Sequence, residues 1–289
     1  MIFTVVFALA AAFSNAVNLM TQHSASVNAP KREKGWRLVA YLVRQPLWLL
    51  GGVAAVGSYA FQALALHYGQ LSVVQPILVT ELVFVLVLRQ VWIGQDVAGA
   101  AWAAAVVVCV ALAVFLTAAE PAGGHPAAER AEWLSAVFVF GGAIAVLAAA
   151  GRRGSPVRRA AVFATAAALT WALEAAFLKT ATQTLTTSGI GGMLTSWPVY
   201  AVIAAAGAGT LLQQAALHVG PLSVSQPGLV IIDPFASIIL SVWLFDERFT
   251  DSPAKIAVAV LAFAVLAVGV TVLSRTAPKD LTPSRPASS

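Results

Sequence analysis

The chain has little charge and a single cysteine. Charged residues make up 10% of its 289 residues against 60% hydrophobic residues, and the mean hydropathy is +0.85. A soluble domain carries roughly 25% charged residues, so most of this chain must face lipid or other buried helices. Cys109 alone excludes a disulfide within the chain, and we interpret it as a small packing residue.

Catalytic motifs are also missing. The sequence holds no Cys/His cluster, no phosphate-binding loop and no Ser-His-Asp spacing, so we expect neither an enzyme nor a cofactor. The net charge of +5 could suggest a nucleic-acid partner. The basic residues fall instead into short clusters between apolar runs, which is the pattern that orients membrane proteins. We therefore predict no nucleic-acid binding.

What the chain does have is a series of long apolar runs. A membrane-spanning helix needs about 20 apolar residues, and nine stretches reach or approach that length. We therefore predict an all-α membrane protein with about nine transmembrane helices. The predicted spans are residues 2–20, 46–66, 71–92, 97–117, 133–150, 160–180, 197–217, 222–245 and 254–273.

The basic residues predict the orientation. With the N-terminus outside, thirteen Lys and Arg residues fall in inside segments and four in outside segments. Cytoplasmic loops carry the excess of positive charge, so the count favours N-terminus out and C-terminus in. Residues 275–289 are rich in Pro, Ser and Thr, and we predict a disordered cytoplasmic tail there.

One segment occurs twice. Residues 62–79 (QALALHYGQLSVVQPILV) and 213–230 (QQAALHVGPLSVSQPGLV) are identical at twelve of eighteen positions at an offset of 151. The repeat divides the chain into residues 1–150, with five helices, and 160–274, with four. Corresponding spans lie five helices apart, which is an odd number, so the second copy runs through the membrane in the opposite direction. Inverted repeats of this kind are typical of secondary transporters.

Three acidic residues lie inside predicted spans. Glu81 and Asp233 occupy nearly matched places in spans three and eight, and Glu174 lies two-thirds along span six. An ionisable group at mid-bilayer costs about 2.5–3.5 kcal/mol on insertion scales, so each acid is a candidate for binding a substrate or ion. The alternative is that each accepts hydrogen bonds from a neighbouring helix. Lys179, near the outer end of span six, is expected to extend to the interface.

Prolines follow glutamines at matched places in the two copies. Gln75–Pro76 and Gln226–Pro227 begin spans three and eight, and Pro234 follows at the centre of span eight. Proline removes a backbone donor and frees a carbonyl, which in a membrane must find another partner or line a cavity. We predict broken or kinked helices here, with Gln75 and Gln226 contacting the solute. A simple packing kink is the alternative.

Two asparagines and a tryptophan complete the candidate site. Asn15 and Asn18 form a polar patch on span one, and Trp171 lies one turn before Glu174. We expect all three to contribute to substrate binding. For the asparagines, hydrogen bonding between helices is an equally open interpretation.

The sequence resembles a known superfamily. The pattern ALxxGPLSVxQP, a following helix with a carboxylate, and then DER (Asp246, Glu247, Arg248) resemble the drug/metabolite transporter superfamily. The segment ALTWALEAAFLK is similar to its duplicated EamA unit. Usual members have ten helices with both ends inside. Nine helices with the N-terminus outside resemble the NIPA-like branch, whose animal members are associated with magnesium transport. The resemblance implies a secondary transporter without a cofactor.

The leading hypothesis is a transporter that moves a small solute across a bacterial cytoplasmic membrane by alternating access around a midplane site. The first alternative is a divalent-cation (magnesium) transporter with Glu81 and Asp233 as metal ligands, because Mg²⁺ binds through one or two carboxylates and keeps several waters. The second is a membrane assembly or sensor protein without a transported substrate. The expected partners are the substrate and the lipid bilayer, and a homodimer is left open.

Overall fold

The computed structural model describes residues 1–27, 44–92, 94, 96–125, 128–219 and 222–276. Within them, nine helices are long and apolar enough to cross a membrane, which confirms the all-α membrane class. Of the predicted tail, residues 275 and 276 are helical at the end of α11 (Pro253–Thr276), which corrects its start, and residues 277–289 lie outside the described residues. The elements are α1 (Ile2–Val27), α3 (Pro46–Tyr68), α4 (Leu71–Leu78), α5 (Glu81–Trp92), α6 (Gly99–Ala119), β1 (Ala122–Gly123), α7 (Arg130–Ala150), α8 (Pro156–Thr195), α9 (Trp197–Val219), α10 (Leu222–Phe245), β2 (Glu247–Arg248) and α11 (Pro253–Thr276).

The sixth span is much longer than predicted. Helix α8 continues to Thr195 instead of ending near residue 180, and its helical geometry is interrupted only at Gly189 (φ 70°). The extension is rich in threonine, whose hydroxyls donate to carbonyls one turn earlier, as in Thr182 to Leu178 at 2.8 Å. These local bonds satisfy the polar side chains inside the helix, so a polar composition does not end it.

The third span is broken, whereas the eighth is not. Helix α4 ends at Leu78 and α5 begins at Glu81, with tight backbone bonds from Val79 to Pro76 (3.3 Å) and from Thr80 to Ile77 (3.0 Å). The break follows Pro76, as its missing donor predicts.

Of the two outcomes predicted for the eighth span, a broken helix or a kinked helix, the break does not occur. Helix α10 is continuous from Leu222 to Phe245 through both Pro227 and Pro234. Pro234 is buried, and surrounding helices in a membrane can accommodate the carbonyl that a proline frees.

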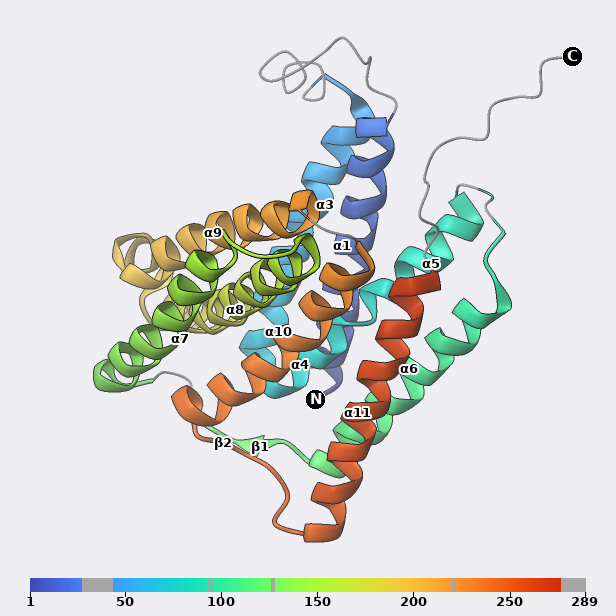
Figure 1. Ribbon diagram of the computed structural model, residues 1–289. Coiled ribbons are helices and arrows are strands. Elements are labelled where there is room, and N and C mark those ends of the chain that lie inside the picture. Colours follow the sequence, from blue (N-terminus) through green and yellow to red (C-terminus); the bar gives the residue numbers. More distant parts are fainter. Residues whose placement is uncertain (28–43, 93, 95, 126–127, 220–221, 277–289) are drawn as a thin grey trace, which may run out of the picture.

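The helices pair in a regular way. The first two helices of each predicted copy pack together, α1 on α3 and α8 on α9. Helix α6 lies along α11, and these two form one flank of the molecule in Figure 1. Helices α4 and α10, which contain the repeated segment, contact each other at the centre. The largest buried apolar cluster draws on helices from both copies, so the core is continuous.

One end of the molecule gathers segments that are far apart in sequence. Strands β1 and β2 pair antiparallel, with Gly123 opposite Glu247. The N-terminus lies near them, and the end of α11 and the loop between α5 and α6 lie at the opposite end (Figure 1). The α3–α4 turn joins α1 there, because the Thr4 hydroxyl donates to the carbonyl of Tyr68 at 3.0 Å. We call this the β1–β2 end.

Candidate functional site

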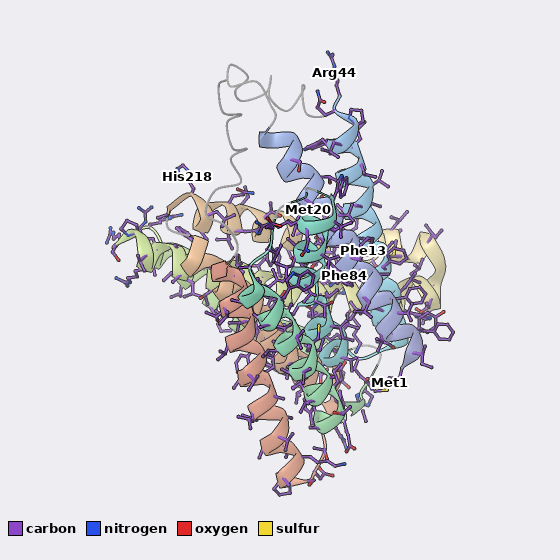
Figure 2. The ribbon with its side chains drawn as sticks, turned by 90° about the vertical axis from the view of Figure 1, so that its right-hand side faces the viewer. Met1, Phe13, Met20, Arg44, Phe84 and His218 are labelled. Atoms are coloured by element: carbon purple, nitrogen blue, oxygen red, sulfur yellow. The ribbon has the colours of Figure 1, made fainter. Side chains whose placement is uncertain are left out.

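Glu81 is held by an asparagine of the first helix. The Asn15 side-chain amide donates to Oε2 of Glu81 at 2.5 Å, and Asn18 donates to the Asn15 carbonyl oxygen at 3.4 Å. The same two helices meet at Phe13 and Phe84, whose rings are 5.5 Å apart and face each other in Figure 2. The broken third span thus places Glu81 at the start of α5, beside the predicted asparagine patch.

Glu174 is the most isolated of the three acids. It is 5% exposed, and its Oε1 atom has no hydrogen-bond partner among the described residues. Tyr59 of α3 lies close enough to interact with it electrostatically. A buried carboxylate oxygen without a partner is costly, so it marks a place where a ligand, ion or proton can bind.

Asp233 connects the other two acids. Its Oδ1 accepts a hydrogen bond from the Ser237 hydroxyl at 3.3 Å. Its carboxylate interacts electrostatically with both Glu174 and Glu81. We call Glu81, Glu174 and Asp233 the acidic centre. Like charges in a medium of low dielectric constant repel strongly, so the centre favours the binding of a proton or other cation.

No positive side chain neutralises the acidic centre within the described part of the chain. The three ion pairs found there involve other acids, namely Glu247, Asp246 and Glu120. Nor do the described residues contain any group of three or more His, Cys, Asp or Glu side chains arranged to hold a metal ion. A cation bound at the acidic centre would therefore depend on further oxygen ligands, such as water.

The other predicted contributors fall in different places. Gln75 is buried in α4 at the centre of the molecule. Trp171 packs its indole against Gly209 of α9, where even a methyl group would clash, so its role there is helix packing. Asn18 leaves its carbonyl oxygen buried without a partner among the described atoms. The side chains of Gln226 and Pro227 lie outside the described residues.

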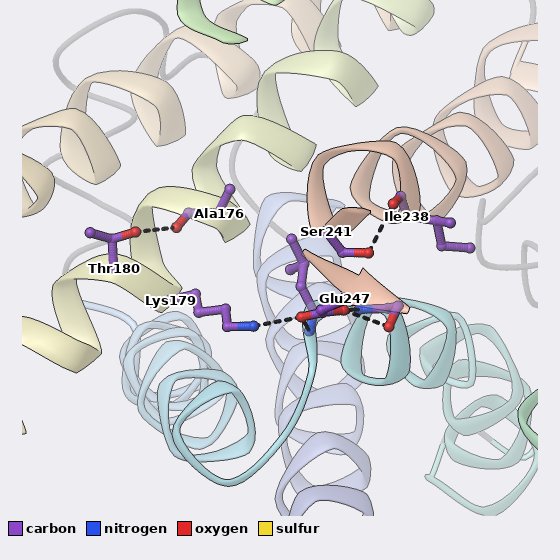
Figure 3. Close-up of polar contacts among 8 residues, drawn as sticks. Ala176, Lys179, Thr180, Ile238, Ser241 and Glu247 are labelled. Carbon is purple, nitrogen blue, oxygen red and sulfur yellow. Dashed lines mark hydrogen bonds and ion pairs between the residues drawn. The ribbon is translucent and has the colours of Figure 1, made fainter. Parts of the chain in front are cut away.

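A second polar cluster lies at the β1–β2 end, and we call it the Glu247 clamp: Leu71, Ser72, Lys179 and Glu247. Figure 3 shows Lys179 and Glu247 with the contact between them. The Glu247 carboxylate accepts from the backbone amides of Leu71 (2.8 Å) and Ser72 (3.0 Å). It also accepts from the Ser72 hydroxyl at 2.6 Å and the Lys179 ammonium at 2.5 Å. Lys179 in turn lies 4.3 Å from the ring centroid of Phe245.

The prediction for Lys179 is therefore wrong. The residue is 8% exposed, and its side chain pairs with Glu247 instead of extending to the interface. Burial by itself raises the pKa of Glu247, but the charge of Lys179 and hydrogen bonds from Lys179 and Ser72 outweigh it and hold the pKa below its ordinary value. Sequence reasoning noted Glu247 only within DER, because its partners lie 68 and about 175 residues away.

An open cavity of about 470 Å³ adjoins the clamp. Helices α1, α3, α4 and α8 and the β1 segment all contribute to its wall, including Thr4, His67, Gln70, His125 and Lys179. The acidic centre does not line it. The clamp and the cavity thus share Lys179, and both lie at the β1–β2 end.

Comparison with known proteins adds one relative. No family model matches the chain, and no solved structure matches it. The chain is 28% identical over 279 residues to an uncharacterised protein of Corynebacterium glutamicum, with 94% of each chain covered. The similarity extends over nearly the whole length of both chains, and the name of the relative states no function.

Proposed function

We propose that the protein is a secondary transporter of the drug/metabolite transporter type, which moves a small solute across a bacterial cytoplasmic membrane by alternating access around the acidic centre. The observation that carries the proposal is the Glu174 carboxylate. It is buried in a membrane-spanning helix, close to Asp233, and one of its oxygens lacks a partner among the described residues. Such a group is expensive to insert into a membrane, and an ionisable residue there is by default a candidate for function.

The direction of the central helices supports an inverted repeat. Glu247 follows the end of α10 and binds the first two residues of α4, so the start of one repeated helix meets the end of the other. Equivalent helices therefore run in opposite directions at this contact. The matched pairing of α1 with α3 and of α8 with α9 supports the same arrangement. Two oppositely oriented copies of one unit give two packings, each open to one side, and that is the basis of alternating access.

The solute binds where the acids and asparagines converge. Glu81 and Asp233 approach from α5 and α10, Glu174 approaches from α8, and Asn15 supplies a neutral amide. A proton or a positively charged group of the solute would relieve the repulsion among the acids. The amides would orient its polar groups. Because the sequence contains no nucleotide-binding motif, we propose coupling to an ion gradient or facilitated exchange.

A ligand screen followed by a flux measurement tests this proposal. Purified protein is screened by thermal shift against metal ions and metabolites, and each stabilising compound is then assayed for uptake into proteoliposomes. We expect Glu174→Gln to abolish both the shift and the uptake. Asp246→Asn is the matched control, because Asp246 is exposed and pairs only with Arg248 among the described residues.

Two results would contradict the proposal. One is uptake that persists unchanged in Glu174→Gln. The other is the absence of flux for every stabilising compound while a stable partner protein co-purifies, which would favour an assembly or sensor role. Stabilisation by divalent cations alone, lost in both Glu81→Gln and Asp233→Asn, would favour the magnesium alternative.

A further inference from the structure

The cavity at the β1–β2 end lies apart from the acidic centre, none of whose three residues lines it. Its volume of about 470 Å³ falls within the range of about 300–1,000 Å³ that is usual for small-molecule pockets. The wall combines the start of α1, the α3–α4 turn, the start of α4, the β1 segment and the middle of α8. The packed fold thus creates a hollow large enough for a small molecule.

Four polar side chains of the wall have no partner among the described residues. They are His67, Gln70, His125 and Gln183, and none of them forms a side-chain hydrogen bond or an ion pair there. A glutamine amide offers two N–H donors, and a neutral imidazole offers one. Donors from the α3–α4 turn, the β1 segment and α8 are therefore available to one ligand.

The charge of the wall has one sign. Lys179 is buried and contributes an ammonium group, and no described residue of the wall is an aspartate or a glutamate. An ammonium and several N–H donors without an opposing carboxylate attract an anion and repel a cation. The cavity therefore differs in charge preference from the acidic centre, where three carboxylates favour a cation.

The ion pair with Glu247 leaves the Lys179 ammonium able to bind a further group. Glu247 is 1% exposed and does not line the cavity, and the amides of Leu71 and Ser72 share in neutralising its carboxylate. Of the three N–H donors of Lys179, Glu247 takes one, and the Phe245 ring lies 4.3 Å from the nitrogen. A third donor remains for the cavity that Lys179 lines.

We propose that this cavity is a binding site for a small anion, which it holds by a carboxylate or phosphate group. Lys179 is the charged contact, and Gln70, Gln183 and the two histidines of the wall donate further hydrogen bonds. The inference goes beyond the proposed transport function, because it concerns a second site with other residues and the opposite charge preference.

Binding of two simple anions to the purified full chain tests the site. Sodium phosphate and sodium succinate are titrated in a calorimeter and in a thermal-shift assay, with sodium chloride of equal ionic strength as the reference. We expect saturable binding of at least one anion. Gln183→Leu should weaken it roughly tenfold, because a hydrogen bond to a charged group is lost. Gln183→Glu keeps the size of the side chain, adds a negative charge and should weaken binding further.

Arg248→Gln is the matched control for charge. It changes the net charge by the same amount as Gln183→Glu and lies at the same end, but Arg248 is exposed and does not line the cavity. Solvent screens such a charge, so the affinity should change by less than about twofold. Glu174→Gln should leave anion binding unchanged as well, since Glu174 belongs to the acidic centre.

The phosphate group could come from a free solute or from a lipid headgroup. Nanodiscs of phosphatidylcholine and of phosphatidylglycerol distinguish these sources. Equal binding of the added anion in both identifies a site for a free solute. Binding that phosphatidylglycerol blocks, together with a stabilisation by this lipid that Gln183→Glu removes, identifies a headgroup site.

Two results would overturn the anion site. One is the absence of saturable binding of either anion together with the absence of stabilisation by phosphatidylglycerol. The other is an equal loss in Gln183→Glu and Arg248→Gln, which would show only a general field at this end. Should Gln183→Glu not fold, Gln70→Leu decides in its place with an expected loss of roughly tenfold, because Gln70 makes no side-chain cap bond to α4.

The anion site and the transport function can fail separately. Loss of the anion site with uptake that still depends on Glu174 would leave the transporter proposal standing. Anion binding that depends on Gln183, with uptake unchanged in Glu174→Gln, would support the anion site and contradict transport through the acidic centre.

Discussion

The two copies of the repeated segment begin alike and then diverge. LSVVQP leads into a helix that stops at Leu78 and restarts at Glu81, whereas LSVSQP leads into one helix of 24 residues. Pro234, which only the second copy contains, lies within the unbroken helix. The number of prolines therefore does not decide where a membrane helix breaks. The neighbouring helices decide whether the freed backbone groups can be satisfied.

The break in the first copy also gives the two acids of the central helices different surroundings. Glu81 sits at the first position of a new helix and is held by Asn15, while Asp233 lies mid-helix and is held only by Ser237 among the described residues. The two copies share a sequence unit, but their carboxylates differ in position within the helix and in hydrogen-bond partner.

The largest effect should come from comparing the buried acid Glu247 with the exposed acid Asp96. Breaking a buried ion pair leaves an uncompensated charge, so Glu247→Gln should lower the free energy of unfolding by about 3–5 kcal/mol. Asp96→Asn should change it by less than about 0.5 kcal/mol, because Asp96 is exposed. Denaturant unfolding in detergent measures both.

A double variant serves as the control for that comparison. Lys179→Met combined with Glu247→Leu removes both charges, and it should cost less than the sum of the two single changes, because neither charge is left buried without its partner. If the double variant loses as much as the sum of the singles, the pair contributes no coupling energy and the clamp is misassigned.

The pH dependence of stability should also differ between buried and exposed acids. The folded-state pKa of Glu247 is lowered, so its contribution is present above its unfolded pKa of about 4.3 and is lost as the pH falls through the lower folded value. The stability difference between wild type and Glu247→Gln should be constant above about pH 5 and shrink below about pH 4.

Glu120 is the exposed comparison. The hydrogen bond from Lys255, followed by the charge of Lys255, lowers its pKa as well. Solvent screens that pair, so Glu120→Gln should leave the pH profile of unfolding nearly unchanged. A profile that changes more in Glu120→Gln than in Glu247→Gln would contradict the assignment of the buried clamp.

A third comparison concerns two glycines of α9. A methyl group at Gly209 would collide with the Trp171 indole, whereas nothing lies within 4 Å of the Cβ position at Gly207. Gly209→Ala should therefore cost about 1–3 kcal/mol through overpacking. Gly207→Ala should be neutral or slightly stabilising. Thermal unfolding of the two variants distinguishes them, and equal effects would show that Trp171 does not pack there.

The smallest effects are expected from exchanging the residues that distinguish the two copies. Pro234→Val restores a backbone donor inside a continuous helix and should not destabilise the protein. Val83→Pro removes the 2.9 Å bond from the Val83 amide to the Thr80 carbonyl and should cost about 0.5–1.5 kcal/mol. Circular dichroism and unfolding measurements check both. A large loss in Pro234→Val would mean that the proline shapes α10 after all.

Much of the fold could be predicted from the sequence, because apolar runs and their length define membrane helices directly. All nine predicted spans are helices. The end of α8 could not be predicted, since its threonines satisfy their own hydroxyls within the helix. The interruption of span three was predicted from Pro76, whereas the continuity of α10 depends on helix contacts that no local pattern encodes.

The site could be predicted in part. Glu81, Asp233, Glu174 and Asn15 are predictable because polar groups in lipid are costly. The structure brings Glu81 and Asn15 into contact and the three acids within electrostatic range. The Glu247 clamp could not be found in this way. Its members lie at the ends of helices, where charged residues are ordinary, and only the packed fold brings them together.

Water access to the acidic centre is the most direct measure of the central claim. In Ser237→Cys with Cys109→Ala, a membrane-impermeant thiol reagent should react from each side of the membrane. A bound solute should slow both reactions, since the reporter adjoins Asp233. A thiol that stays unlabelled from both sides, in protein that remains folded, would contradict transport through this centre.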